Sequence, residues 1–163
     1  NHEYRFLREL MKSGGEFYGL MDEDTDEPII SIPKVYGLRK RGFTYVPWPG
    51  RVDYAGFIIT HGPPRRMPIN LKHCAKWMLE YVKSSGICGD FHRSQFYASV
   101  GDEGQTQGWY ALGCLCRLDP YYSPFPEWNQ GFAYSTVIGA KVHPTLVTVF
   151  DRAFEAAGRV YTY

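Results

Sequence analysis

Histidine and cysteine side chains in the middle of the chain are of the types that bind transition metals. Cys88, His92, Cys114 and Cys116 suit zinc, and the Cys88-x3-His92 spacing is compatible with a zinc site. The Cys114-x-Cys116 pair is tighter than the Cys-x2-Cys pair of most structural zinc sites. These residues form a candidate structural zinc site, which is compatible with any function of the rest of the chain.

The same side chains permit two kinds of hydrolytic chemistry. His92-Arg93-Ser94 and His143-Pro144-Thr145 match the His-x-Ser/Thr pattern of two-histidine phosphoesterases, in which paired imidazoles act as general acid and base. The proline of the second motif argues against this interpretation, because a central strand does not accommodate proline. A cysteine hydrolase would use Cys88 or Cys116 as nucleophile and His143 as base. No residue pattern around either cysteine indicates an activated thiolate.

A third set of residues follows a fixed order between residues 54 and 150. A predicted strand ends in Phe57-Ile58-Ile59-Thr60-His61-Gly62, a helix is predicted at 71–83, and a glycine-containing turn follows at 86–89. Gln95-Phe96-Tyr97-Ala98-Ser99 and then Trp109-Tyr110 come next. This order resembles the diphtheria-toxin and poly(ADP-ribose)-polymerase class of ADP-ribosyltransferases, which split NAD and transfer ADP-ribose.

The resemblance implies a role for each motif residue. The main chain of Gly62 would bond both ends of the nicotinamide carboxamide, since glycine permits a close approach, and His61 would hydrogen-bond the adjoining ribose. Tyr97 and Tyr110 would sandwich the ring, and Ser99 completes the binding motif. NAD is then the substrate, a macromolecule is the acceptor, and no metal ligand is assigned.

Three departures from the family pattern bear on activity. Pro63 stands where the family has Ser or Thr, and Gln95 stands in place of a glycine. Ala133 occupies the position of the catalytic glutamate, and no acidic residue lies between Glu127 and Asp151. A carboxylate there would stabilise the oxocarbenium-like transition state. Either the alignment is shifted, or the domain is inactive, or Ala133 replaces a glutamate; Glu127 is a weak substitute.

The absent acid makes a non-catalytic binding domain the main alternative to an enzyme. Trp48, Trp128 and the proline-rich segments beside them would form its recognition surface. The net charge of +1 argues against a nucleic-acid partner, so a protein is the expected acceptor or partner. The chain contains four cysteines and no apolar run long enough to span a membrane. An intracellular location, cytoplasmic or nuclear, or an effector delivered to a cytosol, is expected.

The patterning predicts an α+β fold with split, largely antiparallel twisted sheets and a few helices, as in ADP-ribosyltransferases. One domain is expected over residues 1–163. Its residues 1–50 form an N-terminal extension to which no known family pattern is assigned. Helical periodicity and stop signals predict helices at 3–12, 71–83 and 151–157. Apolar and β-branched runs predict strands at 29–32, 43–46, 54–60, 95–99, 109–118, 132–138 and 146–150.

Overall fold

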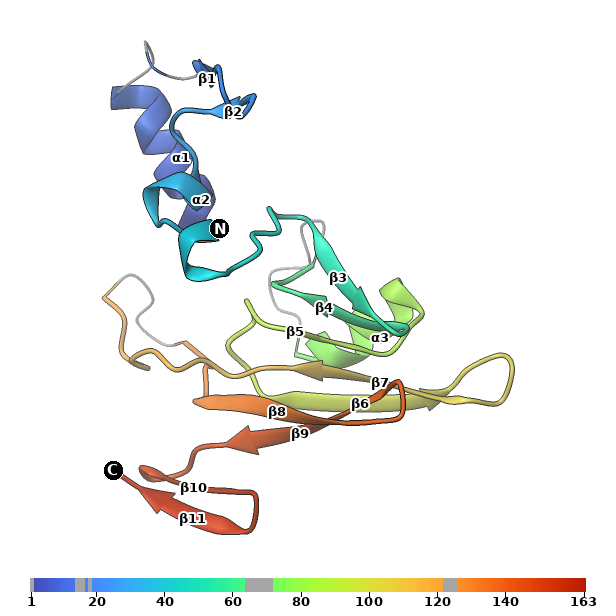
Figure 1. Ribbon diagram of the computed structural model, residues 1–163. Helices are drawn as coiled ribbons and strands as arrows, with labels where there is room; N and C mark the ends of the chain where they lie inside the picture. The colour runs from blue at the N-terminus through green and yellow to red at the C-terminus, as the bar shows by residue number, and fades with distance from the viewer. Residues whose placement is uncertain (1, 14–16, 18, 64–71, 122–125) are drawn as a thin grey trace. The chain divides into compact units, whose positions relative to one another are not determined.

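The computed structural model shows an α+β chain that divides into two compact units, 1–48 and 49–163. It describes residues 2–13, 17, 19–63, 72–121 and 126–163. Figure 1 shows the helices and strands of each unit. The boundary at 48 lies close to the end of the segment that the sequence leaves unplaced, residues 1–50.

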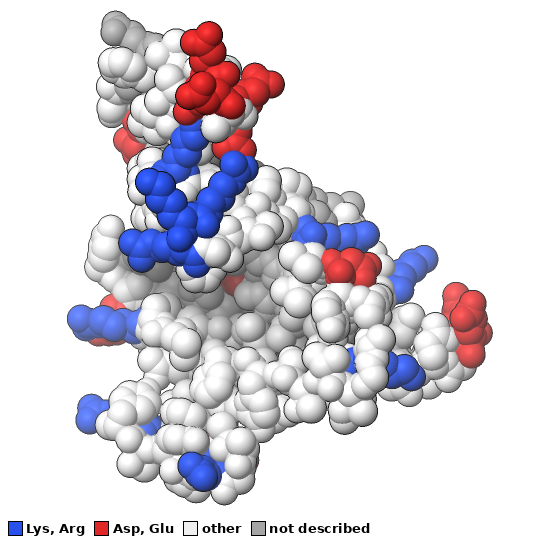
Figure 2. Space-filling view, viewed as in Figure 1, with Lys and Arg blue, Asp and Glu red and all other residues white. Residues whose placement is uncertain are grey.

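The first unit contains two helices, a short strand pair and one helical turn in its described part. Helix α1 spans His2–Ser13, as the apolar spacing predicts. Strands β1 (Met21–Asp22) and β2 (Glu27–Pro28) pair antiparallel around an acidic turn. Helix α2 (Ile32–Val35) and the 3-10 helix η2 (Arg39–Arg41) follow. The acidic and basic side chains of this unit form two adjacent groups in Figure 2.

Neither strand that the sequence predicts in the first unit is present. Ser31 is the N-cap of α2 and Pro33 lies in its first turn, where the fixed φ of proline suits a helix and its missing N–H costs nothing. Residues 43–46 belong to no helix or strand. The β-branched and aromatic residues of these two segments favour strands, but neither segment pairs with a neighbouring strand.

Asp22 holds the turn between β1 and β2. Its Oδ1 accepts hydrogen bonds from the backbone N–H of Asp24 and Thr25, both at 3.1 Å, and Lys34 donates to its Oδ2 at 2.9 Å. The hydrogen bond from Lys34 is the largest cause that lowers the pKa of this carboxyl to about 2. The charged form is thus favoured in the folded chain.

We expect the stability of the first unit to fall when Asp22 is protonated. The folded pKa lies below the unfolded value of roughly 4, so the stabilisation is complete above pH 4 and is lost as pH falls towards 2. Thermal unfolding between pH 5 and pH 2, compared with Asp22→Asn, measures it. The variant should lose less stability across this range, and equal losses in both proteins would contradict the assignment.

The second unit is built on a five-stranded sheet in the order β3-β4-β5-β7-β6. Its strands are β3 (Arg51–Tyr54), β4 (Phe57–Thr60), β5 (Gly86–Cys88), β6 (Gln95–Val100) and β7 (Thr106–Ala111). Strands β4, β5 and β7 run parallel, whereas β3 and β6 are antiparallel edge strands. The α+β prediction is confirmed, but this sheet is mixed, with a parallel centre.

Helix α3 (Cys74–Val82) packs on one face of this sheet (Figure 1). Its buried residues repeat at helical spacing, which is why the predicted helix at 71–83 is present. The helix begins three residues later than predicted. Asn70, whose residue type suits an N-cap for the predicted helix, lies outside the described residues. Trp109 is fully buried at the centre of this core, and its indole N–H donates to Cys88 Sγ at 3.1 Å.

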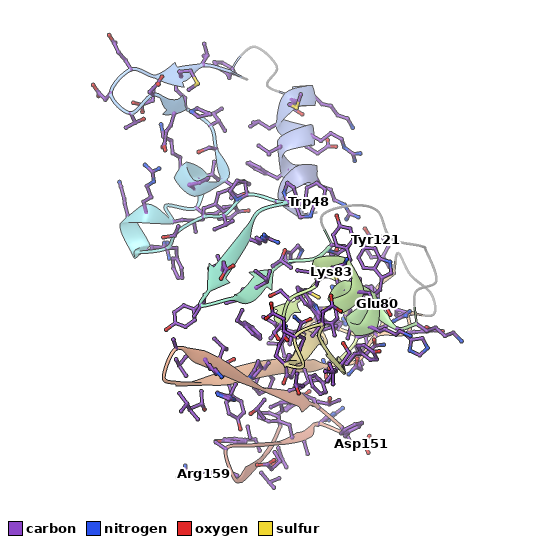
Figure 3. The ribbon with its side chains drawn as sticks, turned by 90° about the vertical axis from the view of Figure 1, so that its right-hand side faces the viewer. Trp48, Glu80, Lys83, Tyr121, Asp151 and Arg159 are labelled. Atoms are coloured by element: carbon purple, nitrogen blue, oxygen red, sulfur yellow. The ribbon has the colours of Figure 1, made fainter. Side chains whose placement is uncertain are left out.

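Two antiparallel hairpins complete the second unit. Strands β8 (Gly131–Ile138) and β9 (Lys141–Thr148) form one, and β10 (Ala153–Ala156) and β11 (Arg159–Thr162) form the other. Asp151 and Arg159 mark the opposite ends of the second hairpin in Figure 3. Phe132 contacts Phe154 edge to face at 5.3 Å, so the two hairpins pack together.

Two predicted elements are replaced by hairpins. The predicted strand at 54–60 is interrupted by Ala55 and Gly56, which have φ of 51° and 81° and connect β3 to β4. The predicted helix at 151–157 is instead β10 and the start of a turn at Ala157 and Gly158, with φ of 50° and 74°. Two left-handed residues in succession give the turn that matches the twist of a β-hairpin.

Candidate metal centre

The three parallel strands of the second unit end at the same edge of the sheet. In register, Thr60 of β4 pairs with Cys88 of β5, which pairs with Ala111 of β7. Ligands in open sheets of this kind commonly bind beyond the carboxyl ends of parallel strands. The residues that follow these strands include side chains that can bind a metal ion or transfer a proton: His61, Asp90, His92, Cys114 and Cys116.

His92, Cys114 and Cys116 meet at this edge. The Nδ1 or Nε2 atom of the histidine and the two Sγ atoms all lie within 4.8 Å of one another. His92 comes from the loop between β5 and β6, and the two cysteines follow β7. Cys114 is buried and Cys116 is exposed, so the cluster lies at the surface. Three of the four predicted zinc ligands are therefore brought together.

Cys88, the fourth predicted ligand, is excluded from this cluster. Its side chain is in the hydrophobic core and accepts the indole hydrogen bond of Trp109. Burial raises the pKa of the Cys88 thiol to about 12, since a thiolate is poorly solvated there. This thiol is a packed core group, and neither a metal ligand nor the nucleophile of a cysteine hydrolase.

Asn129 joins the two loops that carry the three candidate ligands. Its backbone N–H donates to the His92 carbonyl at 2.9 Å, and its carbonyl accepts from the Cys114 N–H at 3.0 Å. Its side-chain Oδ1 accepts from the Ser94 N–H at 2.7 Å. One residue thus fixes the backbone on both sides of the cluster, as the residues surrounding a metal site commonly do.

The neighbours of Asn129 in the chain hold the remaining parts of the cluster. Gln130 donates from Nε2 to the Cys116 carbonyl at 3.1 Å, and the Gly131 N–H donates to the Cys114 carbonyl at 3.1 Å. The Trp128 ring lies edge-on to His92, with ring centroids 4.3 Å apart. We call residues 127–131 the bridging segment. The sequence shows no metal motif in it, so its role was not foreseen.

Close backbone approach at the cluster requires two glycines. A Cβ on Gly131 would lie 2.4 Å from Ser94 Oγ and 2.7 Å from the Val147 carbonyl oxygen. A Cβ on Gly113 would lie 2.6 Å from the Asn129 carbonyl oxygen. Neither position has room for a side chain, so Gly113 and Gly131 allow the bridging segment to lie directly against the residue before Cys114 and against Ser94 and β9.

The Cys114 thiol has a raised pKa, chiefly because of burial and secondly because of its hydrogen bond with Cys116. The raised pKa favours the neutral form of this thiol. A bound divalent cation reverses that preference, because it stabilises the thiolate directly. The cluster thus combines a buried sulfur, an exposed sulfur and an imidazole.

His61 and Asp90 form a separate pair at the same edge. His61 Nε2 lies 3.6 Å from Asp90 Oδ1, and both side chains are partly exposed. A Cβ on Gly62 would lie 2.8 Å from the Cβ of Asp90, so the predicted motif glycine serves a close approach to this aspartate. No motif in the sequence singles out Asp90. An exposed pair of this kind contributes little to stability.

The predicted nicotinamide sandwich is not formed. In the register of β6 and β7, Tyr97 pairs with Trp109 and Phe96 pairs with Tyr110. Directly opposed residues share one face of a sheet and successive residues alternate, so Tyr97 and Tyr110 lie on opposite faces. Tyr97 packs against the core beneath α3, whereas the Tyr110 ring contacts Phe96 at 4.5 Å. This register places the two rings on different faces of the sheet and does not support the prediction that they enclose one ligand.

The other residues of that predicted site are also dispersed. Ser99 lies on β6 opposite Gln107. Ala133 lies on β8 opposite Leu146, in a different sheet from His61 and Tyr97. The predicted order of a strand, the His-Gly pair and a helix is therefore present along the chain. The residues predicted to surround the nicotinamide ring do not lie together.

The two motifs of the phosphoesterase interpretation do not lie on paired strands. His92 is in a loop, whereas His143 lies on β9 opposite Thr136. Gly131, next to the metal cluster, pairs with Thr148, so His143 lies five residues further along β9, or roughly 16 Å. Pro144 is tolerated because β9 pairs with β8 alone. Because His143 lies this far from the cluster, it cannot act as a base for Cys116.

The two tryptophans of the alternative binding surface have different surroundings. Trp128 belongs to the bridging segment and contacts His92. Trp48 is the last residue of the first unit and is exposed. All four cysteines are free thiols. Among the described residues, no helix is long and apolar enough to cross a membrane.

Comparison with known proteins yields no relative from which a function could be transferred. No family model, no curated protein and no solved structure matches the chain.

Proposed function

We propose that the second unit, residues 49–163, is a zinc-binding domain whose ion is held by His92, Cys114 and Cys116. The observation that carries the proposal is the convergence of the three donor atoms within 4.8 Å from two separate loops. Two sulfurs and one imidazole suit zinc, a borderline-soft ion. Ligand atoms around tetrahedral zinc lie about 3.6–3.8 Å apart, so binding of the ion would draw the exposed Cys116 side chain inward.

The proposed site has an open coordination position. Among the described residues, no fourth histidine, cysteine or carboxylate belongs to the cluster. Three protein ligands with a fourth position for water or substrate are typical of catalytic zinc, whereas structural zinc has four protein ligands. At the surface edge of the sheet, the ion would act as a Lewis acid on a molecule bound at that position.

Cobalt substitution tests both the ligands and the open position. The reduced, metal-free chain is titrated with Co²⁺, and we expect one ion per chain with the intense visible bands of tetrahedral coordination and a sulfur-to-cobalt charge-transfer band. Cys114→Ser and Cys116→Ser should each weaken the charge-transfer band, and His92→Gln should lower the affinity. Added azide should shift the visible bands because it can occupy the open position.

Two variants are matched controls for the cobalt experiment. Cys88→Ala removes a buried thiol outside the cluster, and His143→Gln removes an exposed histidine far from it. Both should keep the cobalt spectrum of the unmodified chain. Octahedral cobalt spectra without a sulfur band, or equal losses in the control and ligand variants, would reject the proposal.

ADP-ribosyl transfer from NAD to a protein stays a second proposal, supported by one observation. Strand β4 leads directly into His61 and Gly62, as the sequence resemblance requires. Since Tyr97 and Tyr110 face opposite sides of the sheet, this proposal depends on the His-Gly pair alone. Calorimetric titration with NAD tests it: binding should be weakened by His61→Ala, and no heat at millimolar NAD ends it.

A further inference from the structure

A cavity of about 530 Å³ lies between α3 and the β3–β4 hairpin. Ile58 and Met78 belong to the buried core and form its inner wall. Tyr81 and Val82 of α3 line one side, and Arg51 and Thr60 line the other. A volume of this size is within the range of small-molecule sites.

The cavity has an apolar body and one charged group at its margin. Arg51 and Thr60 are direct cross-strand partners at the ends of β3 and β4, so they lie on the same face of the sheet as Ile58. Among the described residues that line the cavity, Arg51 alone is charged. In the part of the chain that the structure describes, no carboxylate forms an ion pair with it. The Tyr81 ring is held by stacking on Trp77 at 5.0 Å.

We infer that this cavity binds a small monocarboxylate with a planar or branched apolar body. The apolar body would occupy the space bounded by Ile58, Met78 and Tyr81, where burial of carbon surface favours binding. The carboxylate would accept hydrogen bonds from the guanidinium of Arg51, whose planar fork matches its two oxygens. The site is independent of the proposed zinc centre, with which it shares no residue.

Two probes that differ only in charge test this inference. The isotope-labelled chain is titrated with 3-phenylpropanoate and, separately, with 3-phenylpropanamide, and NMR shifts of the residues around the cavity are followed. We expect the acid to bind at least about tenfold more tightly than the amide, as a charge-assisted hydrogen bond contributes that much. Arg51→Gln should remove this difference and leave the affinity for the amide unchanged.

Matched variants make the result decisive. Arg159→Gln alters an exposed arginine that likewise opens an edge strand, β11, but lies outside the cavity, and it should bind both probes normally. Val82→Trp fills the cavity from the end of α3 and should abolish binding of both. Equal affinities for acid and amide, or equal effects of Arg51→Gln and Arg159→Gln, would overturn the inference, as would undiminished binding by a folded Val82→Trp chain.

Discussion

Zinc is expected to raise the thermal unfolding midpoint of the second unit by roughly 10 °C, and a chelator is expected to reverse the shift. The ion would tie the β5–β6 loop to the segment after β7, and it binds only where His92, Cys114 and Cys116 are assembled. At a free zinc concentration of about one hundred times Kd, this linkage adds about 2.7 kcal/mol, which corresponds to that shift in a domain of this size. Scanning calorimetry of the reduced chain measures it.

The ligands are identified by how far zinc raises the unfolding midpoint of each variant, not by the midpoint of the variant without zinc. Cys114→Ser and His92→Gln should lose most of the shift. Cys88→Ala, which takes a buried thiol out of the core, should unfold at a lower temperature but respond to zinc as the unmodified chain does. A shift of the same size in all of these proteins would mean that zinc binds elsewhere.

Replacement of Gly86 by alanine is expected to lower the free energy of unfolding by about 1–3 kcal/mol. A Cβ at this position would lie 2.5 Å from the Trp109 ring and 2.6 Å from the Ile58 carbonyl oxygen. The ring is fully buried and the carbonyl belongs to a central strand, so neither group can move without disturbing the core. Urea unfolding of the chain, followed by its tryptophan fluorescence, to which the buried Trp109 contributes, measures the loss.

Gly101→Ala is the matched control for Gly86→Ala. A Cβ on Gly101 would also come close to its surroundings, at 2.9 Å, but the nearest atom is the side-chain nitrogen of Gln105. This flexible amide on a β-turn can rotate away, so the change should cost less than about 0.5 kcal/mol. If the two substitutions destabilise the chain equally, crowding against rigid groups does not explain the role of Gly86.

The sequence predicts correctly those helices and strands whose pattern of apolar residues matches the period of the element. The apolar spacing of Ala75, Met78 and Leu79 predicted α3, because a helix buries one face at that period. The apolar and β-branched run at 95–99 likewise predicted the strand that is present as β6. The two hairpin turns were missed because Ala55-Gly56 and Ala157-Gly158 are weaker turn signals than Asn-Gly or Asp-Gly. Without such a signal, each segment resembled one continuous element.

The sequence by itself determined the α+β class, helix α3 and the chemical types of the proposed metal donors. Tertiary structure decided which faces and loops meet. Had the register of β6 against β7 slipped by one residue, Tyr97 and Tyr110 would share a face, and no local pattern fixes that register. Likewise, His92 meets Cys114 only because β5 pairs with β7 and Asn129 bonds both loops. Contacts between distant parts of a chain depend on how its sheets pair, which single residues and their spacing do not specify.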